Sequence, residues 1–380
     1  MKIVYSILGT YNAGGMERVL ANKANYLAAK GHELVIITTD QKGRGTNFPL
    51  HPAIQQIDLG INYTDDQHLG ILRKIWSFKK RQRRHYKQLH ALLFELKADI
   101  VISMFDHDAA LMHQIKDGSK KLLEIHFSRF KRLQYDRSGL WKVLNKWRMY
   151  QDLAVAKKYD RFVILTHEDL DYWKGLKNIV VIPNAHTFLP FAPALLVAKH
   201  ALAVGRFDYQ KGFDQLIKAW KKINTQCPEW TLDIYGEGPL KEELAEQIDE
   251  LGLSGRVILH TPVKNIMDVY LDSSIMVMTS RYEGLPMALL EAQACGIPMV
   301  SFACKCGPRD IIRQDKNGFL IAEGDLDDFV EKVSLLMKNQ QLRSTMGNMA
   351  REMSESFSEE RIMRRWLVLF ESLKKEEKAS

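Results

Sequence analysis

Short apolar runs alternate with longer amphipathic segments along almost the whole sequence. An apolar run followed by a segment of helical periodicity is typical of a parallel sheet that carries helices on both faces. We therefore expect an α/β fold with two doubly wound parallel sheets, one after the other. The predicted strands of the first sheet are KIVYSIL, ELVIITT, ADIVISMF, KLLEIHF, RFVILT and IVVIP, and those of the second are ALAVGRF, TLDIYG, VILHT, IMVMTS, PMVSFA and GFLIA.

Three prolines between residues 183 and 193 interrupt this alternation near the middle of the 380-residue chain. The length suits about two domains, and clustered prolines are typical of the segment between domains. We predict a hinge at 185–199 between a first domain, 1–185, and a second domain, 200–356. The last segment, 357–380, has apolar residues at helical spacing, so we expect a helix that packs back on the first domain.

The composition, with 46% apolar and 26% charged residues, is that of a soluble globular protein rather than a disordered or fibrous one. The four cysteines are too few and too clustered for a disulfide framework, so we expect buried thiols and a reducing compartment. The first apolar run stops at Gly9, which is too short for a signal peptide. The uncharged stretch 179–198 contains prolines that a membrane-spanning helix would not carry, so we expect none.

The net charge of +8 is concentrated in the first half of the chain. Residues 1–190 hold 30 Lys and Arg against 18 Asp and Glu, whereas residues 191–380 hold 24 against 28. The segment 73–90 has eight Lys and Arg, no acidic residue and three aromatic residues, and 127–150 repeats this pattern more loosely. Three interpretations stay open: a solvated helix face, a surface for anionic membrane or a lipid diphosphate, and a nucleic-acid site.

Glycines follow the first predicted strand at Gly14 and Gly15 and open a helix. They would allow a phosphate to approach the backbone N–H groups at the start of that helix. The dinucleotide fingerprint G-x-G-x-x-G is absent, and a simple tight turn is the alternative.

Two cations, Arg206 and Lys211, follow the first strand of the second sheet. The carboxyl end of a strand in an open parallel sheet is where ligands bind, so this pair suits a diphosphate. The alternative is that both are surface cations.

The segment TSRYEGLPMALLEAQACGIPMVSF is the most specific part of the chain. Glu283 lies in the loop before a helix and Glu291 lies inside it. The loop residues Gly284, Leu285 and Pro286 carry no cation, so an anion would rest on the backbone N–H groups of that helix. Glu291 could accept bonds from a ribose diol and Glu283 from a second sugar, although each glutamate alone could be an ordinary surface residue.

His126 ends a predicted strand, where its imidazole could orient a sugar hydroxyl or serve a structural role. The pair Asp106 and Asp108 has the spacing of carboxylates that hold a metal in some sugar transferases, but this spacing is common by chance. We expect no metal and no cofactor.

Taken together, these motifs resemble the retaining glycosyltransferases of family 4, which have the GT-B fold of two Rossmann-like domains facing a cleft. The resemblance covers nearly the whole chain and is greatest for the exopolysaccharide subgroup that includes the amylovoran transferases. Where that pattern usually has GPREII, this chain has Asp310 in place of Glu. The segments that match, in family order, are GGMERVLANKANYLAAKGHELVIIT, VIPN, AVGRFDYQKGFDQLIKAW, IYGEGPL, SRYEGLPMALLEAQACGIPMVSF, CGPRDII and NGFLI.

The resemblance implies a role for each of these motifs. Glu283 and His126 would be the catalytic residues that contact the transferred sugar, and Glu291 would bind the ribose of the donor. Such enzymes keep the anomeric configuration of the donor and need no metal. The residues implied to bind the donor diphosphate and sugar are Gly14, Gly15, Arg206, Lys211, Gly284, Leu285, Pro286 and Met287.

The expected function is therefore transfer of a hexose or N-acetylhexosamine from a nucleoside diphosphate sugar, UDP favoured over GDP, to a lipid-linked or polysaccharide acceptor. We expect a cytoplasmic protein held peripherally on the inner membrane face by its basic segment 73–87. Two alternatives are a nucleotide-sugar epimerase on the same fold and a basic nucleic-acid-binding module. The glutamate motif and the lack of a nucleic-acid motif argue against the latter, so no nucleic-acid partner is expected.

Overall fold

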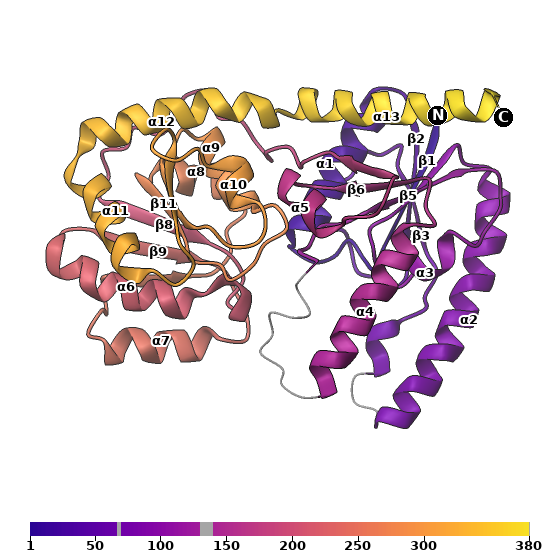
Figure 1. Cartoon of the computed structure of the whole chain (residues 1–380), viewed down its shortest axis with the longest axis horizontal. Coiled ribbons are helices and arrows are strands. Elements are labelled where there is room, and N and C mark those ends of the chain that lie inside the picture. Colours follow the sequence, from indigo (N-terminus) through magenta and orange to yellow (C-terminus); the bar gives the residue numbers. More distant parts are fainter. Residues whose placement is uncertain (67–69, 130–139, 380) are drawn as a thin grey trace.

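The computed structural model describes residues 1–66, 70–129 and 140–379, and these form two parallel sheets, each flanked by helices (Figure 1). The first sheet has seven strands in the order β3-β2-β1-β4-β5-β6-β7, all paired in parallel. Its strands are β1 (Lys2–Ile7), β2 (Glu33–Thr38), β3 (Gln55–Asp58), β4 (Ile100–Ser103), β5 (Lys120–Glu124), β6 (Arg161–Ile164) and β7 (Ile179–Val181).

The second sheet has six parallel strands in the order β10-β9-β8-β11-β12-β13. The predicted α/β class with two doubly wound sheets is confirmed. Its strands are β8 (His200–Val204), β9 (Thr231–Tyr235), β10 (Val257–His260), β11 (Ile275–Met278), β12 (Met299–Phe302) and β13 (Gly318–Ile321).

One strand, β3, was not predicted. Its sequence QQID has a single apolar residue, Ile57, and the other three residues are exposed. It is an edge strand that pairs only with β2, with Ile57 opposite Ile37. A strand that is solvated on most sides lacks the apolar run by which the other strands were found.

Helices cover both faces of each sheet because alternate strand residues are buried on opposite sides. Ile3 and Tyr5 of β1 belong to one core and Val4 to another. The helices of the first domain are α1 (Gly15–Ala29), α2 (Ile71–Leu96), α3 (Ala109–Met112), α4 (Leu140–Ala156) and α5 (His167–Tyr172). Those that follow are α6 (Phe213–Gln226), α7 (Lys241–Glu250), α8 (Ile266–Leu271), α9 (Met287–Ala294), α10 (Pro308–Ile311), α11 (Leu326–Lys338), α12 (Gln340–Ser354) and α13 (Glu359–Ala379). Within the described ranges, every helix is too short or too polar to span a bilayer.

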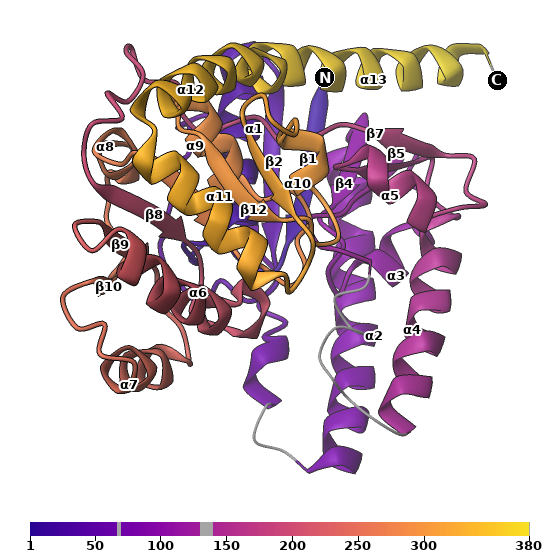
Figure 2. The same ribbon diagram turned by 60° about the vertical axis from the view of Figure 1, so that its left-hand side comes forward.

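The final helix, α13, packs on the first domain although it follows the second in sequence. Figures 1 and 2 both show α12 along the second domain and α13 running on across the first. Trp366 and Phe370 are buried in the same core as Ile3 and Tyr5 of β1. The chain therefore crosses between the domains twice, once at the hinge and once before α13.

All four cysteines are buried and free, as expected for small apolar residues.

The packing of α13 predicts a large stability cost for truncating its buried face. Phe370 is fully buried, so Phe370→Ala should lower the free energy of unfolding by about 3–5 kcal/mol. Val368 on the same helix is 61% exposed, and Val368→Ala is the matched control, with an expected change below about 0.5 kcal/mol. Urea unfolding measures both. Equal midpoints for the two variants would mean that α13 does not depend on this core.

Candidate functional site

Two of the expected site residues meet at the carboxyl edge of the second sheet. Because β8 and β11 are neighbours, the loops that follow them lie side by side. The first loop carries Lys211 and the second carries Glu283, and Lys211 Nζ lies 2.7 Å from Glu283 Oε1. Asp208 fixes the first loop by accepting a hydrogen bond from the backbone N–H of Lys211.

Of the two predicted cations after β8, Lys211 is held by the protein and Arg206 is exposed. Gln210 Nε2 donates to the second oxygen of Glu283 at 3.2 Å and to the Tyr282 carbonyl at 3.1 Å. Burial lowers the pKa of Lys211, but the charge and hydrogen bond of Glu283 together with the charge of Asp208 raise that pKa above its usual value. The side chain of Arg206 is 71% exposed, with Nε 3.8 Å from Asp208 Oδ2. Arg206 is thus open to a ligand, whereas Lys211 is held by the protein.

Glu291 is buried in the fifth position of α9 and is bonded by three donors from three different elements. Thr187 Oγ1 of the hinge lies 2.6 Å and Arg18 Nη1 of α1 3.3 Å from its Oε1, and the Tyr270 hydroxyl of α8 lies 2.9 Å from its Oε2. Burial raises the pKa of Glu291 above its usual value. The charge of Arg18 and, to a smaller extent, the hydrogen bonds from Thr187 and Tyr270 act in the opposite direction. A carboxylate offers about four acceptor positions, so capacity for a further hydroxyl donor remains.

The two domains touch at the site itself. A Cβ on Gly284 would lie 2.6 Å from the backbone carbonyl oxygen of His126, so only glycine permits this approach. A Cβ on Gly15 would lie 3.6 Å from Met287 Cγ, which places the glycine loop of the first domain against the start of α9. The structure therefore brings Gly15, His126, Gly284 and Met287 together.

His126 lies two residues beyond β5, with Nε2 3.0 Å from Oε1 of Glu124. Its side chain is almost fully buried at the junction of the two domains. Asp310, which replaces the glutamate of the related pattern, accepts a hydrogen bond from the backbone N–H of His167 at 2.9 Å. This bond joins α10 of the second domain to α5 of the first.

Two helix starts carry the remaining predicted residues: Gly14 lies at the start of α1, and Leu285 and Pro286 lie just before α9. The Glu17 side chain turns back to the start of its own helix, where its carboxylate lies beside Gly14 and accepts from Asn12 Nδ2 at 3.1 Å. Leu285 is buried in the core of the second domain.

The pair Asp106 and Asp108 lies after β4, and the two carboxylates differ in environment. Asp108 is almost fully buried, and burial first and Asp106 second raise its pKa to about 7. In the part of the chain that the structure describes, no three His, Cys, Asp or Glu side chains are grouped as metal ligands.

The family models match the chain in two consecutive parts. The model "Glycosyltransferase Family 4" matches residues 13–198, and "Glycosyl transferases group 1" matches residues 197–353. An uncharacterized glycosyltransferase of Haemophilus influenzae is 31% identical over 375 residues, covering 96% of this chain and 98% of its own. The chain belongs to the family 4-like glycosyltransferases of the GT-B fold.

Two further comparisons narrow the relationship. The amylovoran biosynthesis glycosyltransferase AmsD of Erwinia amylovora is 35% identical over 217 residues, which are 54% of this chain and 61% of that protein. The crystal structure of a TarM mutant of S. aureus in complex with UDP and glycan ligands superposes with a TM-score of 0.80 at 19% identity, over 97% of this chain and 99% of that one. The second comparison supports the GT-B fold, and the family makes the chain a glycosyltransferase.

Four residues around the carboxylates were not found from sequence. Gln210 binds Glu283, and Arg18, Thr187 and Tyr270 bind Glu291. For Arg18, the one indication in the sequence is its position directly after Glu17, three residues beyond Gly15. Thr187 and Tyr270 come from the hinge and α8, whose contact with α9 is a matter of tertiary packing.

The buried Asp108 predicts a dependence of stability on pH. Its folded-state pKa lies near 7 and its unfolded pKa near 4, so the folded protein holds the extra proton between these values. Stability contributed by that proton is lost as pH rises from about 4 to 7. Asp108→Asn, which cannot ionise, should be more stable than wild type by about 4 kcal/mol at pH 8, with the difference narrowing towards pH 4.

Urea unfolding at a series of pH values measures this difference. Asp171→Asn is the control, because that carboxylate is 74% exposed. A constant difference between Asp108→Asn and wild type at every pH would show that Asp108 is ionised in the folded protein.

Proposed function

We propose that this chain is a retaining glycosyltransferase that moves a hexose or N-acetylhexosamine from a UDP-sugar, rather than a GDP-sugar, to a lipid-linked or polysaccharide acceptor. The observation that carries the proposal is that the motif of Glu283 and Glu291 meets the first domain at two points. Gly284, next to the Lys211–Glu283 pair, touches the His126 backbone, and Glu291 pairs with Arg18. AmsD, by its name, acts in amylovoran biosynthesis, and the TarM structure contains UDP. Both agree with a nucleotide-sugar donor and a glycan product.

In this proposal the donor lies along the carboxyl edge of the second sheet. Glu291 accepts from the ribose hydroxyls, and Arg206 and Lys211 hold the diphosphate. The bond between the anomeric carbon and the phosphate oxygen breaks, the acceptor oxygen bonds to that carbon on the same face, and the acceptor proton leaves with the diphosphate. Fixed cations and the N-terminus of α9 stabilise the charge on the leaving group, and this role needs no metal.

Glu283 and His126 act on the transferred sugar. Glu283 is already oriented by Lys211 and Gln210, so it needs no reorganisation to accept a sugar hydroxyl. The backbone of His126, in the other domain, touches Gly284, the residue after Glu283. Contact between the domains also keeps water from the activated donor.

Substitutions of the two glutamates should have different effects on UDP affinity and on turnover. Glu291→Gln should weaken free UDP by about 10- to 100-fold, the value of a hydrogen bond to a charged group, because UDP contains the ribose. Glu283→Gln should leave UDP affinity within about threefold, because UDP lacks the sugar that Glu283 contacts, yet it should slow release of UDP from the sugar donor. Calorimetric titration with UDP and an assay of UDP release from a panel of UDP-sugars measure the two effects.

Glu246→Gln on the exposed face of α7 is the control and should change neither quantity. Wild-type UDP affinity in Glu291→Gln, or unchanged turnover in Glu283→Gln, would overturn the assignment of the corresponding glutamate.

We further propose that the basic face of α2 holds the enzyme peripherally on the inner face of an anionic membrane. Trp76 is 69% and Phe78 43% exposed among the cations of 73–87. On α4, Trp147 is 56% and Tyr150 70% exposed. Figures 1 and 2 both show α2 and α4 extending beyond the first sheet on the same side. Residues 130–139 of the second basic segment lie outside the described residues.

Vesicle co-sedimentation tests the membrane proposal. Arg81 is excluded from the substitutions because its guanidinium donates to the carbonyls of Ile61 and Asn62. Each exposed cation near an anionic leaflet contributes about 1 kcal/mol. Neutralising Lys79, Lys80, Arg83 and Arg84 to Gln should therefore weaken binding to anionic vesicles at least 10-fold, whereas neutralising the exposed cations Lys218, Lys221, Lys241 and Lys264 of the second domain should not. Equal binding to anionic and zwitterionic vesicles would contradict the proposal and leave 73–87 a solvated helix face.

A further inference from the structure

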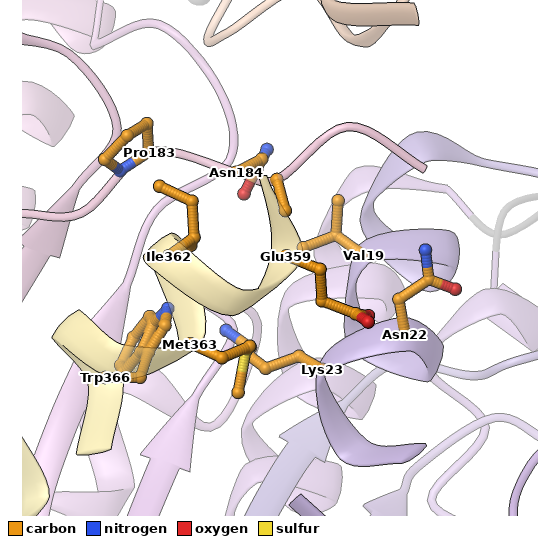
Figure 3. A pocket seen from close by; sticks show the side chains of 10 residues that line it. Val19, Asn22, Lys23, Pro183, Asn184, Glu359, Ile362, Met363 and Trp366 are labelled. Carbon is orange, nitrogen blue, oxygen red and sulfur yellow. The ribbon is translucent and has the colours of Figure 1, made fainter. Parts of the chain in front are cut away.

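A lysine is buried beneath the candidate site and paired with a carboxylate. Lys23 of α1 is 5% exposed and Glu124 at the end of β5 is 1% exposed. Lys23 Nζ lies 2.6 Å from one carboxylate oxygen of Glu124 and 2.5 Å from the other. The same nitrogen lies 4.0 Å from the ring centroid of Trp366 on α13. Figure 3 shows Lys23 lining one pocket with Met363 and Trp366.

Burying an ion pair of this kind in a core has a high desolvation cost. Removing two charges from water costs several kcal/mol for each ion, and an apolar pair of similar volume is often as stable or more so. Although burial alone would raise the pKa of Glu124, Lys23, the strongest of the groups that oppose burial, helps to hold it at about 2. The pair thus keeps an ionised carboxylate inside the first domain, which an apolar pair would not do.

That charge has a second neighbour, the ring of His126. Oε1 of Glu124 lies 3.0 Å from His126 Nε2 and 2.6 Å from Lys23 Nζ. The N–H direction of Nε2 is not aligned for a hydrogen bond to this oxygen, so the contact is electrostatic. The nearby negative charge favours the ring form that carries its proton, rather than its lone pair, on Nε2. Nδ1 is then the ring nitrogen left for a sugar hydroxyl. The backbone carbonyl of His126 is fixed in addition by its contact with Gly284.

We propose that Lys23 and Glu124 are positioning residues for His126: together they fix the tautomer and orientation of its ring, and α13 shields them from water through Trp366. This inference rests on the proposed function, in which His126 contacts the transferred sugar. It extends that function, because α13, at the far end of the chain, then contributes to the geometry of the site.

The test replaces the charged pair by an apolar pair, Lys23→Met with Glu124→Met, which leaves no unpaired charge in the core. The matched control is Lys121→Met with Asp117→Asn, because Lys121 and Asp117 also form a buried ion pair at the opposite end of β5. The first measurement is the ¹⁵N NMR spectrum of histidine-labelled protein, in which the His126 signals are assigned by their absence in His126→Ala. We expect protonated Nε2 in wild type and control, and a mixture of both tautomers in the apolar pair.

The second measurement is the rate of UDP release from a panel of UDP-glucose, UDP-galactose and their N-acetylated forms. A positioned acid–base group contributes about 10²- to 10⁴-fold, so the apolar pair should lose roughly 10- to 100-fold in kcat while the KM for the donor changes less than about threefold. The same pair introduced into His126→Ala should cost nothing further, because its effect passes through the histidine.

Two results would overturn the proposal: a wild-type tautomer in the apolar pair, or a loss of kcat that adds to that of His126→Ala. If the apolar pair does not fold, Glu124→Asp, which keeps both charges but withdraws the carboxylate by one methylene, gives the same two readouts. A wild-type protein that releases UDP from no donor would contradict the proposed function, and the tautomer would then decide the positioning alone.

Discussion

The close approach of Gly284 to the carbonyl of His126 sets the geometry on which the rest of the site depends. A side chain at Gly284 would meet that carbonyl at 2.6 Å, so any other residue would force the two domains apart. Gly284 lies between Glu283 and α9, and His126 lies two residues past β5. This one contact therefore fixes how closely the loop of Glu283 approaches the backbone of His126.

Charge pairing explains how three carboxylates are tolerated near this contact. Glu283 is paired with Lys211, Glu291 with Arg18 and Glu124 with Lys23. Each cation comes from a different element than its carboxylate, so each pair also ties two elements together. Arg18 and Lys23 both belong to α1, five residues apart, so this helix supports the nucleotide side and the histidine side of the site at once. Arg206, 71% exposed, lies in the same loop as Lys211.

The fold was largely predictable because buried parallel strands leave continuous apolar runs in the sequence. The exception, β3, is an edge strand with a single apolar residue, and its pairing with β2 is invisible to such a pattern. The helical spacing in 357–380 predicted an apolar face. Packing on the first domain was expected from that face, and the structure shows Trp366 and Phe370 in the core of the first domain.

The site was less predictable, because motifs mark residues within one loop whereas the site is assembled across elements. Lys211 and Glu283 were both found, but their direct ion pair follows from β8 and β11 being neighbours in the sheet. Thr187 and Tyr270 have no motif of their own and reach Glu291 only through packing. The partners of His126 were hidden for the same reason, since Lys23 looks like any lysine on an amphipathic helix.

We propose that the two domains together form one site for sugar transfer with retention of anomeric configuration. The most direct test is ¹H NMR of the sugar that the enzyme first releases or transfers from an α-linked UDP-sugar, recorded before the anomers of free sugar equilibrate. We expect the α anomer to appear first in wild type. Initial formation of the β anomer would contradict it.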